Sequence, residues 1–314
     1  MIPIAICDDE LLHARQTQAA IRRCEAQAVT RCFETPLALL AAVTQQGYAP
    51  RVAVLDIRMA GMDGIELAKR LNALVPGCAV IFLTAYLSYA PDVYETRHVY
   101  FVLKRELDRR IGSALRAALA ETARRYGFGE KTGIDLPGEV AGSVANEADR
   151  TAAGGTWTGG DTIQAAIGQS ENMMTPLQLA VYASTLAADG VRYAPHIGLR
   201  VTDPADGSVL YERETQIAGR IEYAGDALEQ IRAGMEDVAL YGAGAPYFQG
   251  YPVKVACKTG TAEVPGGSAN SVMILYAPAD DPQIAVAAVI EHGGLGHYSF
   301  PIARDILNAY FGLA

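Results

Sequence analysis

Val52-Ala53-Val54-Leu55-Asp56 is the stretch that decides the fold of the first 121 residues of this chain. Its four apolar residues predict a short buried strand that ends at an acidic residue. Similar apolar runs recur on either side and alternate with amphipathic stretches. The predicted strands are Pro3–Cys7, Thr30–Phe33, Val52–Leu55, Ala79–Leu83 and Val99–Leu103, and the predicted helices are Leu11–Ala28, Pro36–Gln46, Ile65–Leu74, Tyr89–Thr96 and Glu106–Glu121. This alternation indicates an α/β fold with a doubly wound, five-stranded parallel sheet.

Polar side chains follow four of these predicted strands. They are Asp8, Asp9 and Glu10 after the first strand, Asp56 after the third, Thr84 after the fourth and Lys104 after the fifth. Ligands of such sheets bind at the carboxyl ends of the strands, so we expect these side chains to lie together. Clustered carboxylates suit Mg²⁺, and an ammonium and a hydroxyl can stabilise the oxygens of a phosphoryl group in transfer. The pattern therefore predicts a Mg²⁺-dependent phosphoryl-transfer site.

Each of these residues alone has a structural explanation. Asp8 and Asp9 could cap the following helix, and Asp56 could be a turn residue. Their combination at four matched strand ends favours the functional interpretation. A phosphatase of the haloacid-dehalogenase type is a weaker alternative, because it needs Asp-x-Asp after the first strand and Cys7-Asp8-Asp9-Glu10 does not supply it.

Four segments together resemble the receiver domain of response regulators, and their sequences most resemble the receivers of LytTR-type regulators. They are Cys7–Glu10, Val54–Met59 with Gly61–Gly64, Phe82–Ala85 and Phe101–Lys104. The resemblance covers nearly all of residues 1–121 and implies a flavodoxin-like fold, phosphorelay signalling and a sensor histidine kinase as partner. It implies that Asp56 accepts the phosphoryl group, with Thr84 as switch hydroxyl, Phe101 as switch aromatic and Lys104 as the phosphate-contacting lysine.

The same resemblance implies a magnesium site. Asp9, Asp56 and the Arg58 carbonyl would bind Mg²⁺, and Asp8 would assist through water. One departure concerns the residue after Lys104, where the family usually has a cis proline and this chain has Arg105. Because a non-proline cis peptide costs about 3 kcal/mol, we expect either a trans, shifted loop or local strain there.

Composition separates the second half of the chain from the first. The net charge of −9 arises from an acidic excess after residue 123, which argues against a nucleic-acid-binding output domain. The five cysteines are widely spaced without a Cys-x-x-Cys pair, so neither a disulfide framework nor a zinc site is expected. No apolar run reaches membrane-spanning length and no signal-peptide pattern opens the chain, so a cytoplasmic location and no membrane segment are expected.

Residues 122–314 are expected to form an α+β domain, with an antiparallel meander packed under a C-terminal helix. After an irregular stretch from Gly127 to Gly160, helices are predicted at Thr175–Leu186, 223–241 and Pro301–Phe311, and strands at Val253–Cys257, Val272–Tyr276 and Ile284–Ile290. Lys258-Thr259-Gly260-Thr261 follows the first of these strands. In K-T-G motifs the lysine and threonine present an ammonium and a hydroxyl to a substrate carboxylate. The string alone is a weak signal, since Lys131-Thr132-Gly133 repeats it in the irregular stretch.

Context strengthens the second K-T-G. Three segments resemble signatures of penicillin-binding protein transpeptidase domains: Tyr126–Glu139, Ala166–Gln169 with Thr175–Ala180, and Lys258–Glu263. The resemblance implies the C-terminal part of a serine β-lactamase-like domain and assigns substrate binding to Lys258, Thr259, Gly260 and Thr261. Cys257 stands where a glycine commonly precedes the lysine.

The nucleophile of that family is missing from this chain. It is the serine of S-x-x-K, and none of the nine serines has a lysine three residues on. Ser170-Glu171-Asn172 and Ser268-Ala269-Asn270 match S-x-N but lie downstream of the family's position for that motif. Acyl transfer is therefore not expected, binding of a peptidoglycan peptide or a β-lactam is doubtful, and whether the chain is an enzyme stays open.

Three interpretations follow from these observations. The first is a phosphorelay module with an inert or regulatory second half, which could also form a homodimer through unpaired strand edges. The alternative is a peptidoglycan D,D-transpeptidase in cell-wall synthesis. The third, an account of origin, is a chimera of two unrelated genes joined near residues 117–125.

Overall fold

The computed structural model describes residues 2–25, 28–89, 91–158, 161, 164–165, 168–169, 171–223 and 226–313. The chain forms two compact units. The first unit comprises Met1–Thr122, Ala145–Ala166 and Glu222–Gly225, and the second comprises Ala123–Val144, Ile167–Ile221 and Asp226–Ala314. The chain first passes from one unit to the other within a single helix, α4 (Leu107–Arg125).

The first unit contains a five-stranded sheet in which all neighbouring strands are parallel. Its strands are β1 (Ile2–Cys7), β2 (Ala28–Phe33), β3 (Val52–Leu55), β4 (Ala79–Thr84) and β5 (Tyr100–Leu103), in the order β2-β1-β3-β4-β5. Reversal of strand order beside β1 makes the sheet doubly wound, as predicted.

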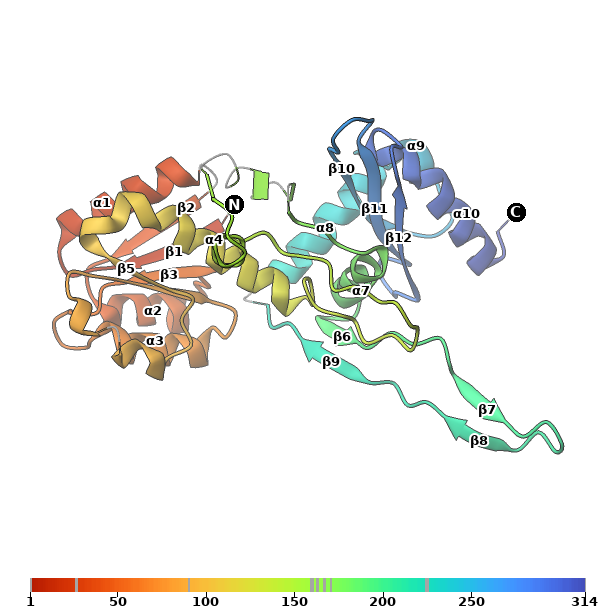
Figure 1. Ribbon diagram of the computed structural model, residues 1–314, viewed down its shortest axis with the longest axis horizontal. Helices are drawn as coiled ribbons and strands as arrows, with labels where there is room; N and C mark the ends of the chain where they lie inside the picture. Colours follow the sequence, from red (N-terminus) through yellow and green to blue (C-terminus); the bar gives the residue numbers. More distant parts are fainter. Residues whose placement is uncertain are drawn as a thin grey trace. The chain divides into compact units, whose positions relative to one another are not determined.

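Helices cover both faces of this sheet (Figure 1). α1 (Leu11–Cys24) and α4 lie on one face, where Ile21 and Ile111 join a core with β1 and β4 residues. α2 (Pro36–Gln46) and α3 (Gly64–Leu74) lie on the other, where Leu39 and Leu67 pack against residues such as Leu55. Full burial of strand residues on both faces explains why the strands are uninterrupted apolar runs.

Two helix predictions in this unit were wrong. The helix predicted over Leu11–Ala28 ends at Cys24, because Ala28 already pairs with Ile2 as the first residue of β2. The helix predicted over Tyr89–Thr96 is replaced by two short 3₁₀ helices, η1 (Leu87–Tyr89) and η2 (Asp92–Glu95). Pro91 lies between them, and proline both lacks a backbone donor and disfavours a helical conformation in the residue before it.

The second unit is built on an antiparallel meander, which confirms the predicted α+β class. Its strands are β10 (Ala256–Ala262), β11 (Asn270–Ala277) and β12 (Ile284–Ile290), in that order. α8 (Ala227–Leu240), α9 (Ala245–Phe248) and α10 (Phe300–Phe311) contribute to one core with alternate β11 residues, including Met273 and Leu275. α7 (Pro176–Ala187) contacts β11 and β12 (Figure 1).

Several elements of the chain were not predicted. The stretch expected to be irregular, 127–160, contains α5 (Glu147–Ala152), which Asn146 caps by accepting a hydrogen bond from Asp149 N. Two short antiparallel pairs, β6 (Val191–Tyr193) with β9 (Ile217–Arg220) and β7 (Arg200–Thr202) with β8 (Val209–Glu212), follow α7. Strands of three or four residues carry too little alternation to be recognised in sequence.

Candidate functional site

Two buried carboxylates lie at the carboxyl ends of neighbouring strands in the first unit. Asp56 N donates to Cys7 O at 2.9 Å and Asp8 N donates to Phe33 O at 3.2 Å, so the backbone pairing continues one residue past each strand. This pairing fixes Asp8 and Asp56 at adjacent positions, where they are 2% and 6% exposed. The sheet therefore brings together residues that are 48 positions apart in the sequence.

Asp9 completes a cluster of three carboxylates. One oxygen each from Asp8, Asp9 and Asp56 lies within 4.8 Å of the others, close enough for one cation to contact all three. Asp9 Oδ2 accepts from Ala60 N at 3.1 Å, and Asp8 Oδ1 accepts from Glu10 N at 3.0 Å. Asp56 Oδ1 has only a long contact, 3.4 Å, with Arg58 N. The donor set, three carboxylates with unused lone pairs, fits a hard cation such as Mg²⁺.

The electrostatics of the cluster favour the arrival of positive charge. Burial raises the pKa of Asp56, hydrogen bonding and attraction by Lys104 oppose the rise, and repulsion by Asp8 adds to it. Burial, followed by the charges of Asp8, Asp9 and Asp56, raises the pKa of Cys7 to about 12. Both shifts have the same partial cause, namely crowded negative charge in a poorly solvated place.

Lys104 supplies the only ammonium that the described residues bring to this cluster. Its Nζ lies 2.7 Å from Asp56 Oδ2 and 2.8 Å from Asp8 Oδ2, and its side chain is 15% exposed. Burial alone would lower the pKa of Lys104, but the hydrogen bonds to Asp56 and Asp8 outweigh it and raise the pKa. The peptide to Arg105 is trans, since the one cis peptide among the described residues is Ala277-Pro278. Lys104 reaches Asp56 without the cis bond.

The other two predicted residues of this site lie near it in different ways. Thr84 is fully buried at the end of β4, and its Oγ1 accepts a hydrogen bond from Tyr86 N at 3.3 Å. Phe101 is partly buried on β5, pairs with Phe82 in the sheet and packs against the core under α2 and α3. Thr84 therefore lies at the end of β4, directly before the cavity-lining residues Ala85 and Tyr86, and Phe101 lies within the sheet.

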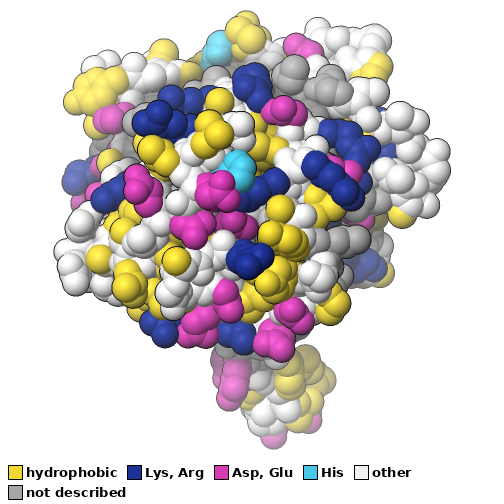
Figure 2. All heavy atoms as spheres, turned by 90° about the vertical axis from the view of Figure 1, so that its left-hand side faces the viewer, with side chains coloured by type: hydrophobic (Ala, Val, Ile, Leu, Met, Phe, Trp, Pro, Cys, Tyr) yellow, Lys and Arg dark blue, Asp and Glu magenta, His cyan; other side chains and the backbone are white. Residues whose placement is uncertain are grey.

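The carboxylates open into a cavity of about 410 Å³, whose lining includes residues that sequence reasoning missed. The lining comprises Asp9, Glu10, His13, Asp56, Arg58, Met59, Ala60, Ala85, Tyr86 and Lys104. Arg58 Nη1 donates to Tyr86 Oη at 3.2 Å, and its guanidinium lies 5.4 Å from the centre of that ring. Figure 2 shows acidic side chains gathered beside a histidine on one face of the molecule.

His13 could have been found from the sequence. His13 is on the predicted helix Leu11–Ala28, which begins two residues after Asp9. Residues four positions apart lie on the same side of a helix, so His13 is expected on the side that faces Asp9. Its Nδ1 is 3.1 Å from Lys104 Nζ and 3.4 Å from Glu10 Oε2.

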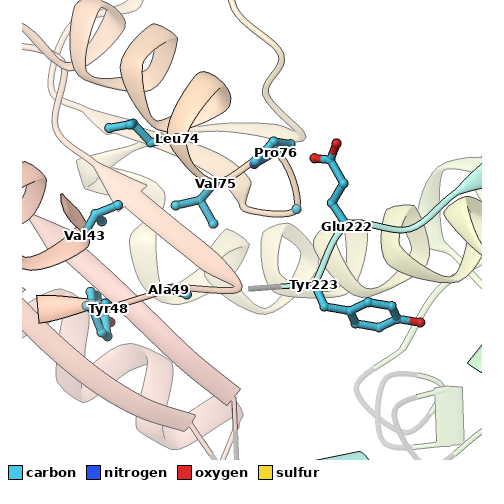
Figure 3. A pocket seen from close by; sticks show the side chains of 10 residues that line it. Val43, Tyr48, Ala49, Leu74, Val75, Pro76, Glu222 and Tyr223 are labelled. Atoms are coloured by element: carbon cyan, nitrogen blue, oxygen red, sulfur yellow. The ribbon is translucent and has the colours of Figure 1, made fainter. Parts of the chain in front are cut away.

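A second cavity, of about 250 Å³, lies at the opposite, amino ends of β3 and β4 (Figure 3). Its lining is largely apolar, with Val43, Leu74 and Val75 among the residues, and Glu222 contributes a carboxylate. No cluster of catalytic side chains faces it among the residues that line it. The cavity at the carboxyl ends is therefore the stronger candidate for chemistry.

In the second unit the K-T-G motif lies inside a strand and not after one, which corrects the prediction. β10 begins at Ala256, because its pairing partner β11 ends at Ala277, and the pairing continues to Ala262. Lys258 is exposed and its Nζ donates to Thr259 O at 2.7 Å. Thr261 Oγ1 accepts from Gly296 N at 3.1 Å, and Gly260 lies opposite Val272 in the pairing. The motif occupies the outer edge of the three-stranded sheet.

A loop that carries the other K-T-G string is held together by its own signature residues. Glu139 accepts hydrogen bonds from Thr132 N at 2.5 Å, Thr132 Oγ1 at 2.6 Å and Gly133 N at 3.1 Å. Asp135 accepts from Ile197 N and Gly198 N at 2.8 and 2.9 Å. Thr132 and Gly133 are therefore structural, as their irregular setting suggested.

Gln178 connects this loop to α7. The side chain is 2% exposed, and its Nε2 donates to Glu130 O at 2.8 Å and to Ala141 O at 2.7 Å. Its Oε1 accepts from Thr175 N at 2.9 Å, and its own N donates to Thr175 Oγ1, which completes a capping box. The Gln178 side chain thus joins the Tyr126–Glu139 segment to the Thr175–Ala180 segment.

Neither S-x-N string forms a catalytic edge in what the structure describes. Ser170 lies outside the described residues, as do Ala166 and Ile167. Asn172 Nδ2 donates to Gln169 O at 3.2 Å. In the other string, Asn270 Oδ1 accepts from His292 N at 2.9 Å and Ser268 O contacts the His292 ring at 3.1 Å. Both asparagines have local structural partners.

The sheet order and the strand-end carboxylates with Lys104 define a receiver-type unit, and the meander with K-T-G on its edge defines a transpeptidase-type unit. Family comparison agrees with both. Residues 4–116 match the response regulator receiver domain, and residues 99–310 match the penicillin binding protein transpeptidase domain. The chain belongs to the penicillin-binding protein transpeptidase family and also carries a receiver domain.

Individual relatives match the transpeptidase part. Penicillin-binding protein 2A of Bacillus subtilis is 32% identical over 208 residues, which is 60% of this chain and 28% of the relative. Penicillin-binding protein 2B of Streptococcus pneumoniae is 35% identical over 210 residues, 61% of this chain and 29% of the relative. The solved penicillin-binding protein PBP2 of Helicobacter pylori superposes with a TM-score of 0.53 at 28% identity, covering 63% of this chain and 36% of that one. The chain thus spans about a third or less of the first two relatives. No helix in the described part of the chain is both long and apolar enough to cross a membrane.

Proposed function

We propose that the first unit is the phosphoryl acceptor of a phosphorelay and that Asp56 takes the phosphoryl group. The observation that carries this proposal is the position of Lys104 Nζ, 2.7 Å from Asp56 Oδ2, beside an acidic cluster that opens into a cavity. Phosphoryl transfer requires a positioned acceptor and positive charge near the phosphoryl oxygens, and little further covalent chemistry from the protein. A sensor histidine kinase is the expected donor.

In this step an oxygen of Asp56 attacks the phosphorus atom of the donor. A new P–O bond forms, the bond from phosphorus to the leaving group breaks, and the leaving group departs with the electron pair. Lys104 offsets the negative charge of the phosphoryl oxygens, and the Thr84 hydroxyl donates to one of them. Asp8, Asp9, Asp56 and the Arg58 carbonyl would hold Mg²⁺, which supplies further positive charge when bound.

The test is the intact mass of the protein after incubation with acetyl phosphate and Mg²⁺. The wild-type chain should gain one phosphoryl group that is stable to acid and labile to base, and Asp56→Asn should gain none. Asp63→Asn is the matched control, because Asp63 caps α3 through Glu66 N at 2.8 Å and asparagine caps equally well. Unmodified wild-type protein, or equal gain in Asp56→Asn, would overturn the proposal.

We propose as well that the second unit performs no acyl transfer. K-T-G can position a substrate carboxylate, but acylation needs a nucleophile with an adjacent base, and no serine of this chain is followed by lysine at the third position. Incubation with a fluorescent penicillin should leave the chain unlabelled after denaturing electrophoresis, beside an active penicillin-binding protein that is labelled. A covalent band that boiling does not remove would contradict this.

The chain also fits an origin by fusion of segments from two families. The two family matches overlap over residues 99–116, which include the start of α4. Amplification of genomic DNA and messenger RNA across the codons for residues 90–130 tests this. A single uninterrupted product from both supports a natural fusion, and a product from neither supports an artefactual one.

A further inference from the structure

His13 lies against Lys104 at the wall of the cavity. It is on α1, whereas Lys104 follows β5, and the two residues are 91 positions apart. His13 Nδ1 is 3.1 Å from Lys104 Nζ, and the His13 side chain is 33% exposed at the cavity wall.

An ammonium has three N–H donors and no acceptor. The three neighbours of Lys104 Nζ are Asp56 Oδ2 at 2.7 Å, Asp8 Oδ2 at 2.8 Å and His13 Nδ1 at 3.1 Å. Asp56 Oδ2 and His13 Nδ1 lie at hydrogen-bonding distance from the ammonium, and Asp8 Oδ2 forms an ion pair with it, so three neighbours constrain the position of Lys104. Two of these neighbours, Asp8 and Asp56, are negatively charged carboxylates, whereas the His13 imidazole is not an anion.

That difference matters when a cation enters the carboxylate cluster. The oxygens of Asp8 and Asp56 are then shared with a second positive charge, which weakens their hold on the ammonium and repels it. Neutral His13 stands outside the cluster of carboxylates. The contact between His13 Nδ1 and Lys104 Nζ can therefore still hold the ammonium in place when Asp8 and Asp56 bind a second cation.

The tautomer of His13 decides whether this contact is a hydrogen bond. Nδ1 must be unprotonated to accept from Lys104, whereas a protonated Nδ1 would donate to Glu10 Oε2 at 3.4 Å. The Lys104 contact is shorter, and Glu10 is largely exposed with a side-chain exposure of 66%. A contact with a charged donor in a half-buried place outweighs a longer one to a solvated carboxylate.

We propose that His13 is a positioning residue for phosphoryl transfer, which accepts a hydrogen bond from Lys104 through Nδ1 and holds the ammonium over Asp56. The proposal rests on the function proposed for Asp56. The first helix of the unit, α1, would then contribute His13 to the reaction site. Together, α1 and the end of β5 would fix the position of the Lys104 ammonium.

The first test needs no phosphorylation. Nitrogen NMR of the full chain labelled with ¹⁵N-histidine and ¹⁵N-lysine should show an unprotonated Nδ1 in His13 and a slowly exchanging Lys104 ammonium signal, with and without Mg²⁺. In His13→Ala the ammonium signal should broaden in the presence of Mg²⁺, and in His13→Asn, whose amide oxygen can accept, it should persist. A protonated Nδ1, or an unchanged Lys104 signal in His13→Ala, would overturn the proposal.

The second test measures phosphorylation by acetyl phosphate in Mg²⁺. Loss of one hydrogen bond to a charged donor should lower kcat at least about tenfold in His13→Ala with little change in KM for the donor. His13→Asn should recover most of kcat, and Gln16→Ala, an exposed change on the same helix, should equal wild type. Equal kcat in wild type and His13→Ala would refute the positioning role. If the wild type itself takes no phosphoryl group, the proposed function fails, and the NMR result still decides whether His13 holds Lys104.

Discussion

Replacement of Gln178 by alanine should destabilise the second unit by about 3 kcal/mol. The value follows from the three shorter hydrogen bonds of a side chain that is 2% exposed: to Glu130 O at 2.8 Å, to Ala141 O at 2.7 Å and from Thr175 N at 2.9 Å. A fourth, from Nε2 to Gly127 O, is 3.5 Å long. Each of the three shorter bonds contributes about 1 kcal/mol net, and more where the remaining partner stays buried without a replacement. The Thr175 cap on Gln178 N involves the backbone and survives the change.

Gln178→Glu is a sharper version of the same perturbation. It keeps the volume but puts a carboxylate oxygen in place of Nε2, opposite the carbonyl oxygens of Glu130 and Ala141. At neutral pH it should destabilise the unit at least as much as alanine, because two attractions become repulsions around a poorly solvated charge.

The assay is urea unfolding followed by circular dichroism, with hydrogen exchange and mass spectrometry to assign the change to residues 127–142. Gln216→Ala, at an exposed position before β9, is the control and should stay within about 0.5 kcal/mol of wild type. If Gln178→Ala also stayed within that range, or if exchange in residues 127–142 did not accelerate, the reasoning that one buried amide holds the two signature segments would be refuted.

Three further changes test other parts of the structure. Gly64→Ala should destabilise the first unit and abolish phosphorylation, since a Cβ there would lie 2.0 Å from Asp56 O. In Gly47→Ala the new Cβ meets nothing within 4 Å, so this variant should show only the modest cost of a left-handed φ. Thermal melts and intact mass compare the two variants. Asp135→Asn should be less stable than wild type at pH 7. Hydrogen bonds from Ile197 N and Gly198 N lower the pKa of Asp135 below 3.8, so its contribution is present above that value and is lost as the pH falls through the lowered pKa; urea midpoints of the two proteins should therefore converge in acid. Removal of Mg²⁺ with a chelator should lower the melting temperature of the wild-type first unit and leave that of Asp9→Asn nearly unchanged, since a ligand that binds only the folded state stabilises it.

Sequence alone was sufficient for the parallel sheet because its strands are buried on both faces. Val52–Leu55 is the clearest case: four apolar residues end at a carboxylate, and the structure has the strand at the predicted residues. The matched strand ends also placed Asp8, Asp56 and Lys104 together correctly. The rule that ligands meet at the carboxyl edge requires no knowledge of side-chain conformations, which is why it succeeds.

Sequence reasoning failed where long-range partners decide local structure. The limits of β10 depend on where β11 ends, and nothing in Lys258-Thr259-Gly260 records that. Pro91 stands inside the predicted helix Tyr89–Thr96, and the structure has two short 3₁₀ helices on either side of it. The contact of His13 with Lys104 crosses 91 positions, so the helix period could suggest the side on which His13 lies but could not name its partner.

The carboxamide of Gln169 has a consequence for the open edge of the meander. Its Nε2 donates to Thr261 O at 2.9 Å and its Oε1 accepts from Glu263 N at 3.1 Å, so one side chain imitates a short length of neighbouring backbone. No other strand of the described residues pairs with the outer edge of β10, and the open part of this edge ends at Thr261, directly after the K-T-G residues. An extended peptide that paired with the outer edge of β10 could not continue past Thr261, because the Gln169 carboxamide occupies that position. The Gln169 side chain would therefore limit how many residues of such a peptide can pair with β10.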